Sequence, residues 1–397
     1  MEEQLVEQEI EKYLNENLIW CEKCHFCNTV CPIVESRVSQ GSFGINRAIY
    51  YGLKWNEINE DLRNLVYSCT TCGKCNLMCK KVSRALPLTE IIEKAREYLL
   101  VEKMAGPMPE QVSVLKNMHI RGNPWGNPPH ERTKWADGLE VTFASKENKV
   151  DVLYFVGCAC SYDPQGQRIA RNMVKILNQA RVNFGILENE TCSGHEAKRM
   201  GEIGLFQYLS ESNISMFKQA GVSHIVTSDP HSFYSFTHEY PEWGKGIKVQ
   251  HYTQFINELI KDGKLRLGSE VKKRVTYHDP CYLGRHSGVF EEPRELIGQI
   301  QGVDLVEMEN AREDSNCCGM GGGRMWMEPP KGLVSSQVIA EKRIEQALDT
   351  RAEILLTACP FCNITLNDAV KSMKKEGSIK VVDITELIVM SLNAFDS

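Results

Sequence analysis

Short apolar runs alternate with amphipathic stretches along the last two thirds of the chain. The apolar runs predict strands at residues 150–156, 183–187, 224–227, 275–278, 304–307 and 354–357. Stretches whose apolar residues recur three or four positions apart predict helices at residues 168–180, 335–348 and 364–374. Strands that alternate with helices in this way predict α/β units built around a mostly parallel sheet.

The first part of the chain has a different pattern, in which helical periodicity dominates. Residues 2–18 and 86–100 predict helices, and residues 47–66 predict a helical insert between two groups of cysteines. We therefore expect an α-helical domain over residues 1–103. Residues 104–148 are rich in glycine and proline and predict a structured linker, whose two tryptophans provide surfaces for packing.

An internal repeat divides the remainder into two halves, residues 149–272 and 273–397. Four segments recur in the same order: residues 152–158 match 275–281, residues 192–194 match 317–319, residues 227–230 match 357–360, and residues 247–249 match 379–381. The repeat predicts two homologous α/β domains.

The length and net charge of the chain limit the classes of protein to which it can belong. A chain of 397 residues suits two or three domains, and its net charge of −6 provides no basic excess for nucleic acid. No apolar stretch approaches the roughly 18 to 20 residues of a membrane span, and the acidic N-terminus lacks the features of an export signal. We expect a cytoplasmic protein with reduced thiols, which reaches the inner face of a membrane only through a partner.

Eight of the sixteen cysteines form two runs with the same C-x₂-C-x₂-C-x₃-C spacing, residues 21–31 and residues 69–79. This is the ligand run of a bacterial-type ferredoxin with two 4Fe–4S clusters, in which the fourth cysteine of each run binds the other cluster. We assign the first cluster to Cys21, Cys24, Cys27 and Cys79. We assign the second cluster to Cys69, Cys72, Cys75 and Cys31.

Zinc and disulfides are the other interpretations of these runs. Structural zinc sites usually combine two C-x₂-C pairs, rather than four cysteines in one short run. Disulfides need an oxidising compartment, and the N-terminus offers no route to one. The spacing therefore favours iron and an electron-transfer protein.

Five further cysteines follow the predicted strands of the second half: Cys281, Cys317, Cys318, Cys359 and Cys362. Residues 319–323 read Gly-Met-Gly-Gly-Gly, but Arg324 stands where a dinucleotide-binding G-x-G-x-x-G motif needs its last glycine. A flavin or nicotinamide site therefore lacks support. The glycines leave room for backbone N–H groups to approach cluster sulfides.

This cysteine spacing resembles the cysteine-rich CCG domain of heterodisulfide reductases. The whole arrangement, a two-cluster ferredoxin module followed by two repeated Rossmann-like α/β domains, resembles the D-type subunit of those enzymes. The resemblance implies a noncubane 4Fe–4S cluster held by all five cysteines of the second half. A five-cysteine zinc site or a set of buried structural cysteines is the alternative, although structural zinc takes four ligands.

The first half departs from this pattern. Cys158 matches Cys281 and Cys192 matches Cys317, whereas the positions of Cys318, Cys359 and Cys362 are occupied by Ser193, Asp229 and Ser232. Oxygen ligands suit iron–sulfur clusters poorly, so we expect no cluster at Cys158, Cys160 or Cys192. The alternative is a mixed site in which these three cysteines combine with His195 or His231.

One noncubane cluster favours an electron relay, because the resemblance implies that full heterodisulfide reductases use two facing clusters, one for each sulfur of the substrate. We predict an iron–sulfur electron-transfer subunit of a heterodisulfide-reductase-like oxidoreductase complex. Its partners would be a flavin-containing subunit or an electron-transferring flavoprotein, and a membrane cytochrome or quinone-linked subunit as a candidate acceptor.

The alternative function is terminal thiol–disulfide or quinone-linked reduction at the noncubane cluster, and the sequence leaves open whether the chain itself is an enzyme. Candidate catalytic residues near that cluster are His278, Asp279, Arg285, His286 and Arg324. Their other interpretation is a hydrogen-bonded shell that tunes the cluster. A zinc-bearing scaffold is a third class, which the cysteine spacing disfavours.

Overall fold

The computed structural model describes residues 2–21, 24–34, 41–103, 106–240, 246–329 and 333–392. Contacts divide the chain into two compact units whose segments interleave along the sequence. Unit 1 comprises residues 1–116, 195–206 and 316–342, and unit 2 comprises residues 117–194, 207–315 and 343–397. Three of the boundaries fall inside helices α6 (Pro109–Arg121), α10 (Ile203–Gln219) and α14 (Ser336–Asp349).

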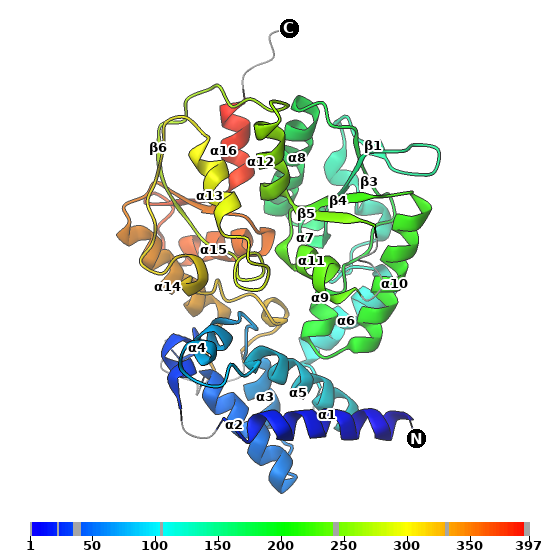
Figure 1. Ribbon diagram of the computed structural model, residues 1–397, viewed down its shortest axis with the longest axis vertical. Helices are drawn as coiled ribbons and strands as arrows, with labels where there is room; N and C mark the ends of the chain where they lie inside the picture. The colour runs from blue at the N-terminus through cyan, green and yellow to red at the C-terminus, as the bar shows by residue number, and fades with distance from the viewer. Residues whose placement is uncertain are drawn as a thin grey trace. The chain divides into compact units, whose positions relative to one another are not determined.

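Unit 1 is helical, as the sequence predicted. Helix α1 (Glu2–Leu18) has the predicted bounds, buries Ile10, Leu14 and Leu18, and contacts α2 (Gly41–Trp55) and α5 (Leu88–Lys103) (Figure 1). The predicted helical insert is two helices, since it contains the end of α2 and most of α3 (Glu60–Tyr67). The other elements of unit 1 are η1 (Phe26–Val30), α4 (Lys74–Val82), α9 (His195–Arg199) and η6 (Arg324–Trp326).

Local sequence sets where the helices around the second cysteine run begin. Asn59 caps α3, because its side-chain oxygen accepts a hydrogen bond from the N–H of Leu62 at 3.0 Å. Helix α4 follows Gly73, whose φ of 77° is a left-handed conformation that glycine adopts without strain. Cys75 and Cys79 are four residues apart in α4 and therefore lie on the same face of that helix.

Unit 2 contains two parallel sheets with the same internal order. The first sheet has the order β1-β3-β2-β4-β5, and the second has the order β7-β6-β8-β9. The strands are β1 (Thr142–Phe143), β2 (Val152–Phe155), β3 (Phe184–Ile186), β4 (His224–Thr227), β5 (Lys248–His251), β6 (Lys273–Tyr277), β7 (Val303–Leu305), β8 (Ile354–Thr357) and β9 (Lys380–Asp383). Apart from β1, the two sheets correspond strand for strand, as the internal repeat predicted.

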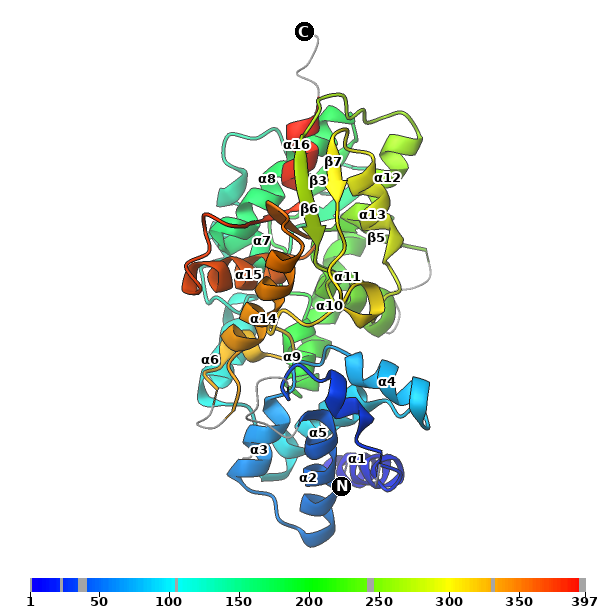
Figure 2. The ribbon, with the colours of Figure 1, turned by 90° about the vertical axis from the view of Figure 1, so that its left-hand side faces the viewer.

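Helices cover both sides of these strands. Figure 2 shows α13 (Glu291–Gly298) on one side of β6 and β7, and α15 (Pro360–Ser372) on the other. The remaining elements of unit 2 are η2 (Pro129–Glu131), η3 (Lys134–Ala136), α7 (Cys158–Tyr162), α8 (Pro164–Gln179), α11 (Pro230–Tyr234), η4 (Ser235–Glu239), α12 (Tyr252–Lys261), η5 (Arg312–Asp314) and α16 (Ile384–Ser391).

A single apolar cluster in unit 2 joins the two halves. It includes Tyr154 of the first sheet and Tyr277 of the second, together with apolar side chains of α8, α12 and α16. Helix α8 of the first half contacts α15 and α16 of the second half. The halves therefore share a core.

Each of the six predicted strands is present, and β4 and β8 have the predicted bounds. The segment predicted as a structured linker, residues 104–148, contains α6, a helix that the sequence analysis did not predict. Glycine and proline flank this helix and do not interrupt it. Within the described residues, none of the helices is both long and apolar enough to cross a bilayer.

Candidate functional site

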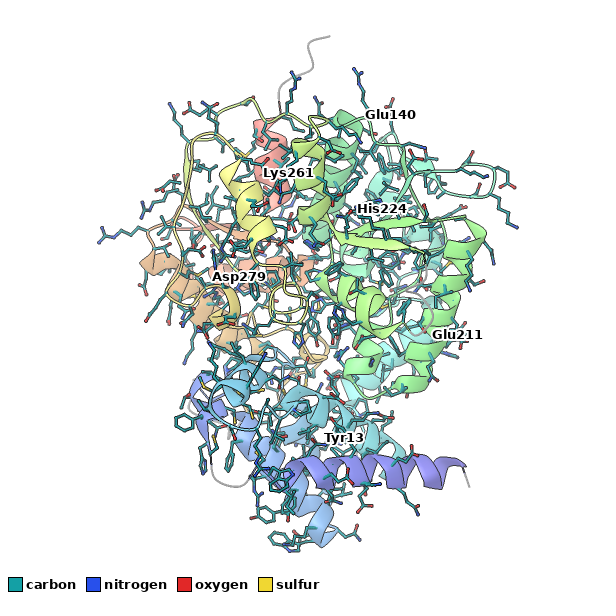
Figure 3. All side chains as sticks on the ribbon, viewed as in Figure 1. Tyr13, Glu140, Glu211, His224, Lys261 and Asp279 are labelled. Atoms are coloured by element: carbon teal, nitrogen blue, oxygen red, sulfur yellow. The ribbon has the colours of Figure 1, made fainter. Side chains whose placement is uncertain are left out.

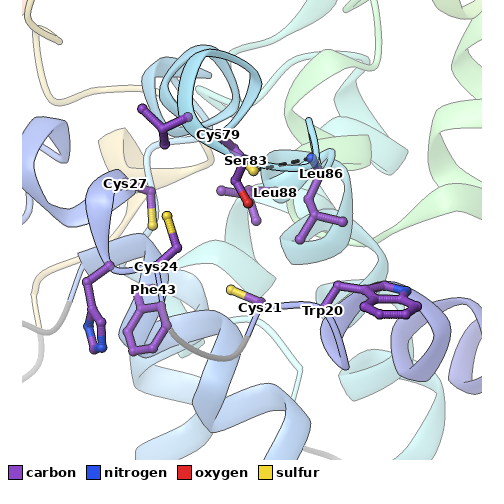
Figure 4. Close-up of a pocket in the computed structure, with 11 residues that line it drawn as sticks. Trp20, Cys21, Cys24, Cys27, Phe43, Cys79, Ser83, Leu86 and Leu88 are labelled. Carbon is purple, nitrogen blue, oxygen red and sulfur yellow. Dashed lines mark hydrogen bonds between the residues drawn. The ribbon is translucent and has the colours of Figure 1, made fainter.

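Four cysteines from both ligand runs line one pocket of unit 1. We call Cys21, Cys24, Cys27 and Cys79 the first thiol group, and Figure 4 shows them around the pocket with Trp20 and Phe43. The N–H of Leu86 donates a hydrogen bond to the Cys79 sulfur at 3.3 Å. Burial, together with the neighbouring Cys27 and Cys79 sulfurs, raises the pKa of Cys21 to about 12.

The other four cysteines of the two runs form the second thiol group, Cys31, Cys69, Cys72 and Cys75. All four are buried. Burial raises the pKa of the Cys31 thiol to about 12, and the charges of Cys69 and Cys72 add to that increase. The structure thus places each fourth cysteine beside the first three of the other run, which is the grouping that crossed ligation requires.

Ser42 is a residue of this site that the sequence analysis missed. It is buried at the start of α2, and its hydroxyl hydrogen-bonds the thiol of Cys27 in the first group and the thiol of Cys75 in the second. A serine one residue after Gly41 carries no signal of its own in the sequence, because its role depends on how α2 packs between the two runs.

The donor chemistry of both thiol groups fits iron–sulfur clusters. All eight cysteines are free thiols, and burial among other sulfurs raises the pKa of Cys21, Cys31 and Cys69 to between about 11 and 12. Four crowded thiolates are stable only when a metal centre supplies positive charge, which is what iron does in such sites.

Three of the five cysteines of the third set lie at strand ends in unit 2. Cys281 follows β6, Cys359 is the N-cap of α15 after β8, and Cys362 lies in the first turn of α15. Burial acts to raise the pKa of Cys359, but hydrogen bonds with Cys362 and His231 outweigh it and lower the pKa to about 6. Carboxyl ends of parallel strands at a switch in strand order are where α/β proteins bind ligands.

The other two cysteines of the set belong to unit 1. Cys317 and Cys318 are buried, and the N–H of Gly319 donates a hydrogen bond to the Cys317 sulfur at 3.3 Å. Because these two cysteines and the other three belong to different units, the five-cysteine ligand set stays a prediction.

The replaced positions of the first half form one hydrogen-bonded network in unit 2. The Ser232 hydroxyl lies 2.7 Å from a carboxylate oxygen of Asp229 and 3.1 Å from the Ser193 hydroxyl. Oxygen atoms thus occupy the positions that correspond to three cysteines of the second half.

The remaining thiols of the first half have separate environments. Cys158 and Cys192 hydrogen-bond each other, and the guanidinium of Arg132 lies 3.5 Å from the Cys158 sulfur. Arg132 also forms a buried ion pair with Glu190 at 2.6 Å. Cys160 is packed in the apolar cluster of unit 2. Of the two histidines considered for a mixed site, His195 belongs to unit 1, whereas these thiols belong to unit 2.

His231 is directed instead toward the second half. Its Nδ1 lies 3.0 Å from a carboxylate oxygen of Asp229, and the imidazole also hydrogen-bonds the Cys359 thiol. One ligand atom from each of these three buried residues lies within 4.8 Å of the others. The first half therefore supplies a polar contact to Cys359, a predicted cluster ligand of the second half.

The candidate catalytic residues of unit 2 have specific partners. Arg343 Nε lies 3.1 Å from Nδ1 of His278, while Arg294 pairs with both oxygens of Asp279, at 2.6 and 3.0 Å (Asp279 is labelled in Figure 3). Arg285 donates hydrogen bonds to the carbonyls of Glu313 and Ser315 at 3.1 and 2.6 Å, and His286 stacks on Tyr282 at 4.3 Å.

Arg324, the fifth candidate, lies in unit 1. It is buried and donates a hydrogen bond to the Ser68 carbonyl at 2.6 Å, directly before the second cysteine run. These contacts favour the interpretation in which the candidates orient and tune ligand-bearing loops.

Comparison with known families agrees with the class of protein that these sites define. Residues 17–82 match the 4Fe-4S dicluster domain, and residues 152–237 and 275–367 match the cysteine-rich (CCG) domain. The chain is therefore an iron–sulfur protein that combines a ferredoxin module with two CCG domains.

Similarity to individual proteins identifies the family more specifically than the domain matches do. The chain is 39% identical over 340 residues to the probable iron-sulfur-binding oxidoreductase FadF of Bacillus subtilis, covering 83% of this chain and 47% of that protein. It is 34% identical over 333 residues to the EtfAB:quinone oxidoreductase of Syntrophomonas wolfei, covering 81% and 46%. The chain spans about half the length of these two relatives.

A third relative is matched over most of its own length. The D-type subunit of the dihydromethanophenazine:CoB–CoM heterodisulfide reductase of Methanosarcina barkeri is 33% identical over 340 residues, which are 84% of this chain and 79% of that relative. The chain belongs to the family of heterodisulfide reductase D-type subunits.

Proposed function

We propose that the chain is the electron-relay subunit of a heterodisulfide-reductase-like oxidoreductase complex. The observation that carries this proposal is the arrangement of eight thiols from two ligand runs as two groups of four in unit 1. When bound there, 4Fe–4S clusters supply one-electron storage and transfer. The chain itself supplies the thiolate ligands, the hydrogen bonds to their sulfurs and a buried environment.

The ligand sets of the proposal are those that the cysteine spacing predicts for the two cubanes and that the family resemblance implies for the noncubane cluster. The first thiol group holds one cubane and the second thiol group holds the other. Cys281, Cys317, Cys318, Cys359 and Cys362 hold one noncubane cluster, and the first half holds none. The network of Ser193, Asp229 and Ser232 supports the last point, because these side chains hydrogen-bond one another where thiolates would be needed.

The partners follow from the relatives and from the chemistry of the chain. One relative is an EtfAB:quinone oxidoreductase by name and another is a heterodisulfide reductase subunit. We propose a flavin-containing electron-transfer protein as one partner and a quinone-linked or cytochrome-containing subunit as the other. Contact with a membrane would then go through that second partner.

Iron analysis of the anaerobically purified chain tests the number of clusters. We expect about twelve iron atoms per chain, four for each of three clusters. The double substitution Cys317→Ser/Cys318→Ser should remove about four of them. The matched double substitution Cys158→Ser/Cys192→Ser should remove none, because that pair lies beside Arg132 and Glu190 in the half without a cluster. About sixteen iron atoms in the wild-type chain, or iron loss in the control, would contradict the assignment.

A second candidate function, terminal reduction at the noncubane cluster, is favoured by the buried contact of Asp229 and His231 with Cys359. Anaerobic mixing separates the two functions. A relay that has been reduced by dithionite and freed of excess reductant stays reduced when an organic disulfide is added without a partner protein. A terminal disulfide reductase is oxidised by the disulfide within the mixing experiment and yields its thiol.

A further inference from the structure

The glycine-rich segment after Cys317 and Cys318 packs directly on the second cysteine run within unit 1. A Cβ atom added to Gly321 would lie 2.4 Å from the carbonyl oxygen of Thr70, and one added to Gly322 would lie 2.5 Å from the carbonyl oxygen of Cys69. Both obstacles are backbone atoms, so no side chain fits at either position. The glycines therefore allow the backbone that carries the double cysteine to touch the backbone that carries the second thiol group.

Arg96 ties these two backbones together. Its side chain is completely buried and donates hydrogen bonds to the carbonyls of Cys69 at 2.7 Å and Gly322 at 2.9 Å. It also donates to the carbonyls of Val66 at 3.0 Å and Arg199 at 2.6 Å. One guanidinium from α5 thus joins the second cysteine run to the glycine-rich segment.

Arg324 makes a second link between the glycine-rich segment and the second cysteine run. Only 2% of its surface is exposed, and it donates hydrogen bonds to the carbonyls of Ser68 and Val334. Burial lowers the pKa of Arg324 to about 10, and the sulfurs of Cys317 and Cys69 are the first charged groups that oppose this decrease. Arg324 therefore has one predicted ligand of the noncubane cluster and one member of the second thiol group as neighbours.

In the described part of the chain, neither Arg96 nor Arg324 forms an ion pair with an acidic side chain. The ion pairs of that part include Arg199 with Glu93 at 2.5 Å in the same unit, but none that involves Arg96 or Arg324. Backbone carbonyls solvate a buried guanidinium only in part, and an uncompensated buried charge is strongly destabilising. A 4Fe–4S cluster with thiolate ligands is an anion, and it would supply the missing negative charge.

We propose that Arg96 and Arg324 are positioning residues that act as counter-charges to the clusters at this junction and raise their reduction potentials. The inference rests on the proposed function and assigns the step at which electrons pass between the second cubane and the noncubane cluster. A buried cation stabilises the reduced cluster, which carries one more negative charge, more than it stabilises the oxidised cluster. Each guanidinium would therefore make the cluster beside it easier to reduce.

Redox titration of the full chain, followed by electron paramagnetic resonance, tests this assignment. Arg324→Met should shift the midpoint potential of the second cubane to a more negative value. We expect about a tenfold change in the equilibrium constant for its reduction, which corresponds to about 59 mV for one electron. Arg324→Lys keeps the charge and should retain most of the wild-type potential.

Two controls identify the cause of a shift. The first cubane is an internal control, because none of its ligands is among the main charge contacts of Arg324. Arg63→Met, which removes a partly exposed arginine of α3 that pairs with Glu60 at 2.9 Å, should leave all potentials unchanged. If Arg324→Met loses iron, Arg324→Gln provides the same comparison, since it keeps a hydrogen-bond donor and removes the charge.

The outcomes separate this inference from the proposed function. Wild-type iron content with an unchanged potential in the Met and Gln variants would overturn the counter-charge role and leave the relay intact. Equal shifts in the Lys and Met variants would also overturn it, because they would show that packing and not charge sets the potential. A wild-type chain without iron–sulfur signals would refute the relay itself.

Discussion

Three oxygen-bearing side chains show how the first α/β half has diverged from the second. Ser193, Asp229 and Ser232 replace cysteines, and in the structure they form a continuous network. The network leads to His231, which contacts Cys359 of the other half. The first half, which has oxygen-bearing side chains at three of these positions, thus contacts a predicted cluster ligand of the second half.

Removal of Cys79 tests the crossed ligation. Cys79→Ala should reduce or abolish the cluster of the first thiol group, because this sulfur lines the same pocket as Cys21, Cys24 and Cys27. The cluster of the second thiol group should remain. Electron paramagnetic resonance of the reduced chain, with iron analysis, measures both.

The matched variant is Cys31→Ala, which should produce the opposite loss. If Cys79→Ala instead removes the cluster held by Cys69, Cys72 and Cys75, ligation runs within each cysteine run and the crossed assignment is wrong.

The cysteines could be predicted from the sequence because a cluster imposes fixed spacing on its ligands. The residues that support them could not. Ser42 and Arg96 are brought to the thiol groups by helix packing, and His231 reaches Cys359 from the opposite half of the repeat. These contacts join segments that are far apart in the chain, so the pattern of neighbouring residues in the sequence does not reveal them.

At the scale of elements, the alternation of strands and helices was predictable because a parallel sheet buries its strands on both faces and leaves continuous apolar runs. The edge strands β5 and β9 were not predicted, and both begin with a lysine. Helix α6 was missed because glycine and proline on either side of it dominate the composition of its segment.

Helix α16 begins at a carboxyl group whose ionisation should be visible in stability. Asp383 caps the helix by accepting the N–H of Thr385 at 3.0 Å, and the same oxygen accepts the hydroxyl of Tyr252 at 3.0 Å. Burial raises the pKa of Asp383 to about 7, although these hydrogen bonds oppose the increase.

Asp383→Asn should therefore change the dependence of stability on pH. The folded chain holds this proton more tightly than the unfolded chain, so the contribution of Asp383 is complete below pH 4 and is lost as pH rises to about 7. Asparagine also caps helices but does not ionise. As the pH rises through this window, we expect the free energy of unfolding of the wild type to fall relative to that of the variant. The expected change in their difference is up to about 1.4 kcal/mol per pH unit.

Denaturant unfolding at several pH values, monitored by circular dichroism, measures this difference. Asp368→Asn is the matched control, because that carboxylate is half exposed and pairs with Lys371. A constant difference between Asp383→Asn and wild type from pH 4 to pH 8 would show that Asp383 is ionised in the fold throughout.

At the scale of the whole molecule, the two thiol groups and the two sheets belong to different units, whose segments interleave along the chain. Unit 1 contains both thiol groups together with Cys317 and Cys318, although the latter belong by sequence to the second α/β half. Unit 2 contains both sheets and one shared core. Because the sequence repeat follows the sheets, it predicted the two halves correctly and gave no indication that their cysteine loops divide between units.

A local excess of positive charge stands out against the net charge of −6. Lys80, Lys81 and Arg84 are exposed directly after Cys79, and the Arg84 guanidinium lies 3.8 Å from the centre of the Trp20 ring at the pocket of the first thiol group. Cys24 of that group is exposed as well. An exposed cluster edge beside charge of one sign is where an oppositely charged redox partner docks.

Lys80→Glu/Lys81→Glu should therefore slow the entry of electrons from an acidic donor. With a reduced flavodoxin as the probe, we expect the second-order rate constant at low ionic strength to fall about tenfold, within the range of electrostatic steering. Added salt should slow the wild type by screening this attraction and should not slow the variant. Lys374→Glu/Lys375→Glu, at two exposed residues that follow α15 in unit 2, makes the same change in net charge and should leave the rate close to that of the wild type. Stopped-flow absorbance of the clusters provides both rates, and equal slowing in the two variants would show that electrons enter under the control of overall charge and not at the first thiol group.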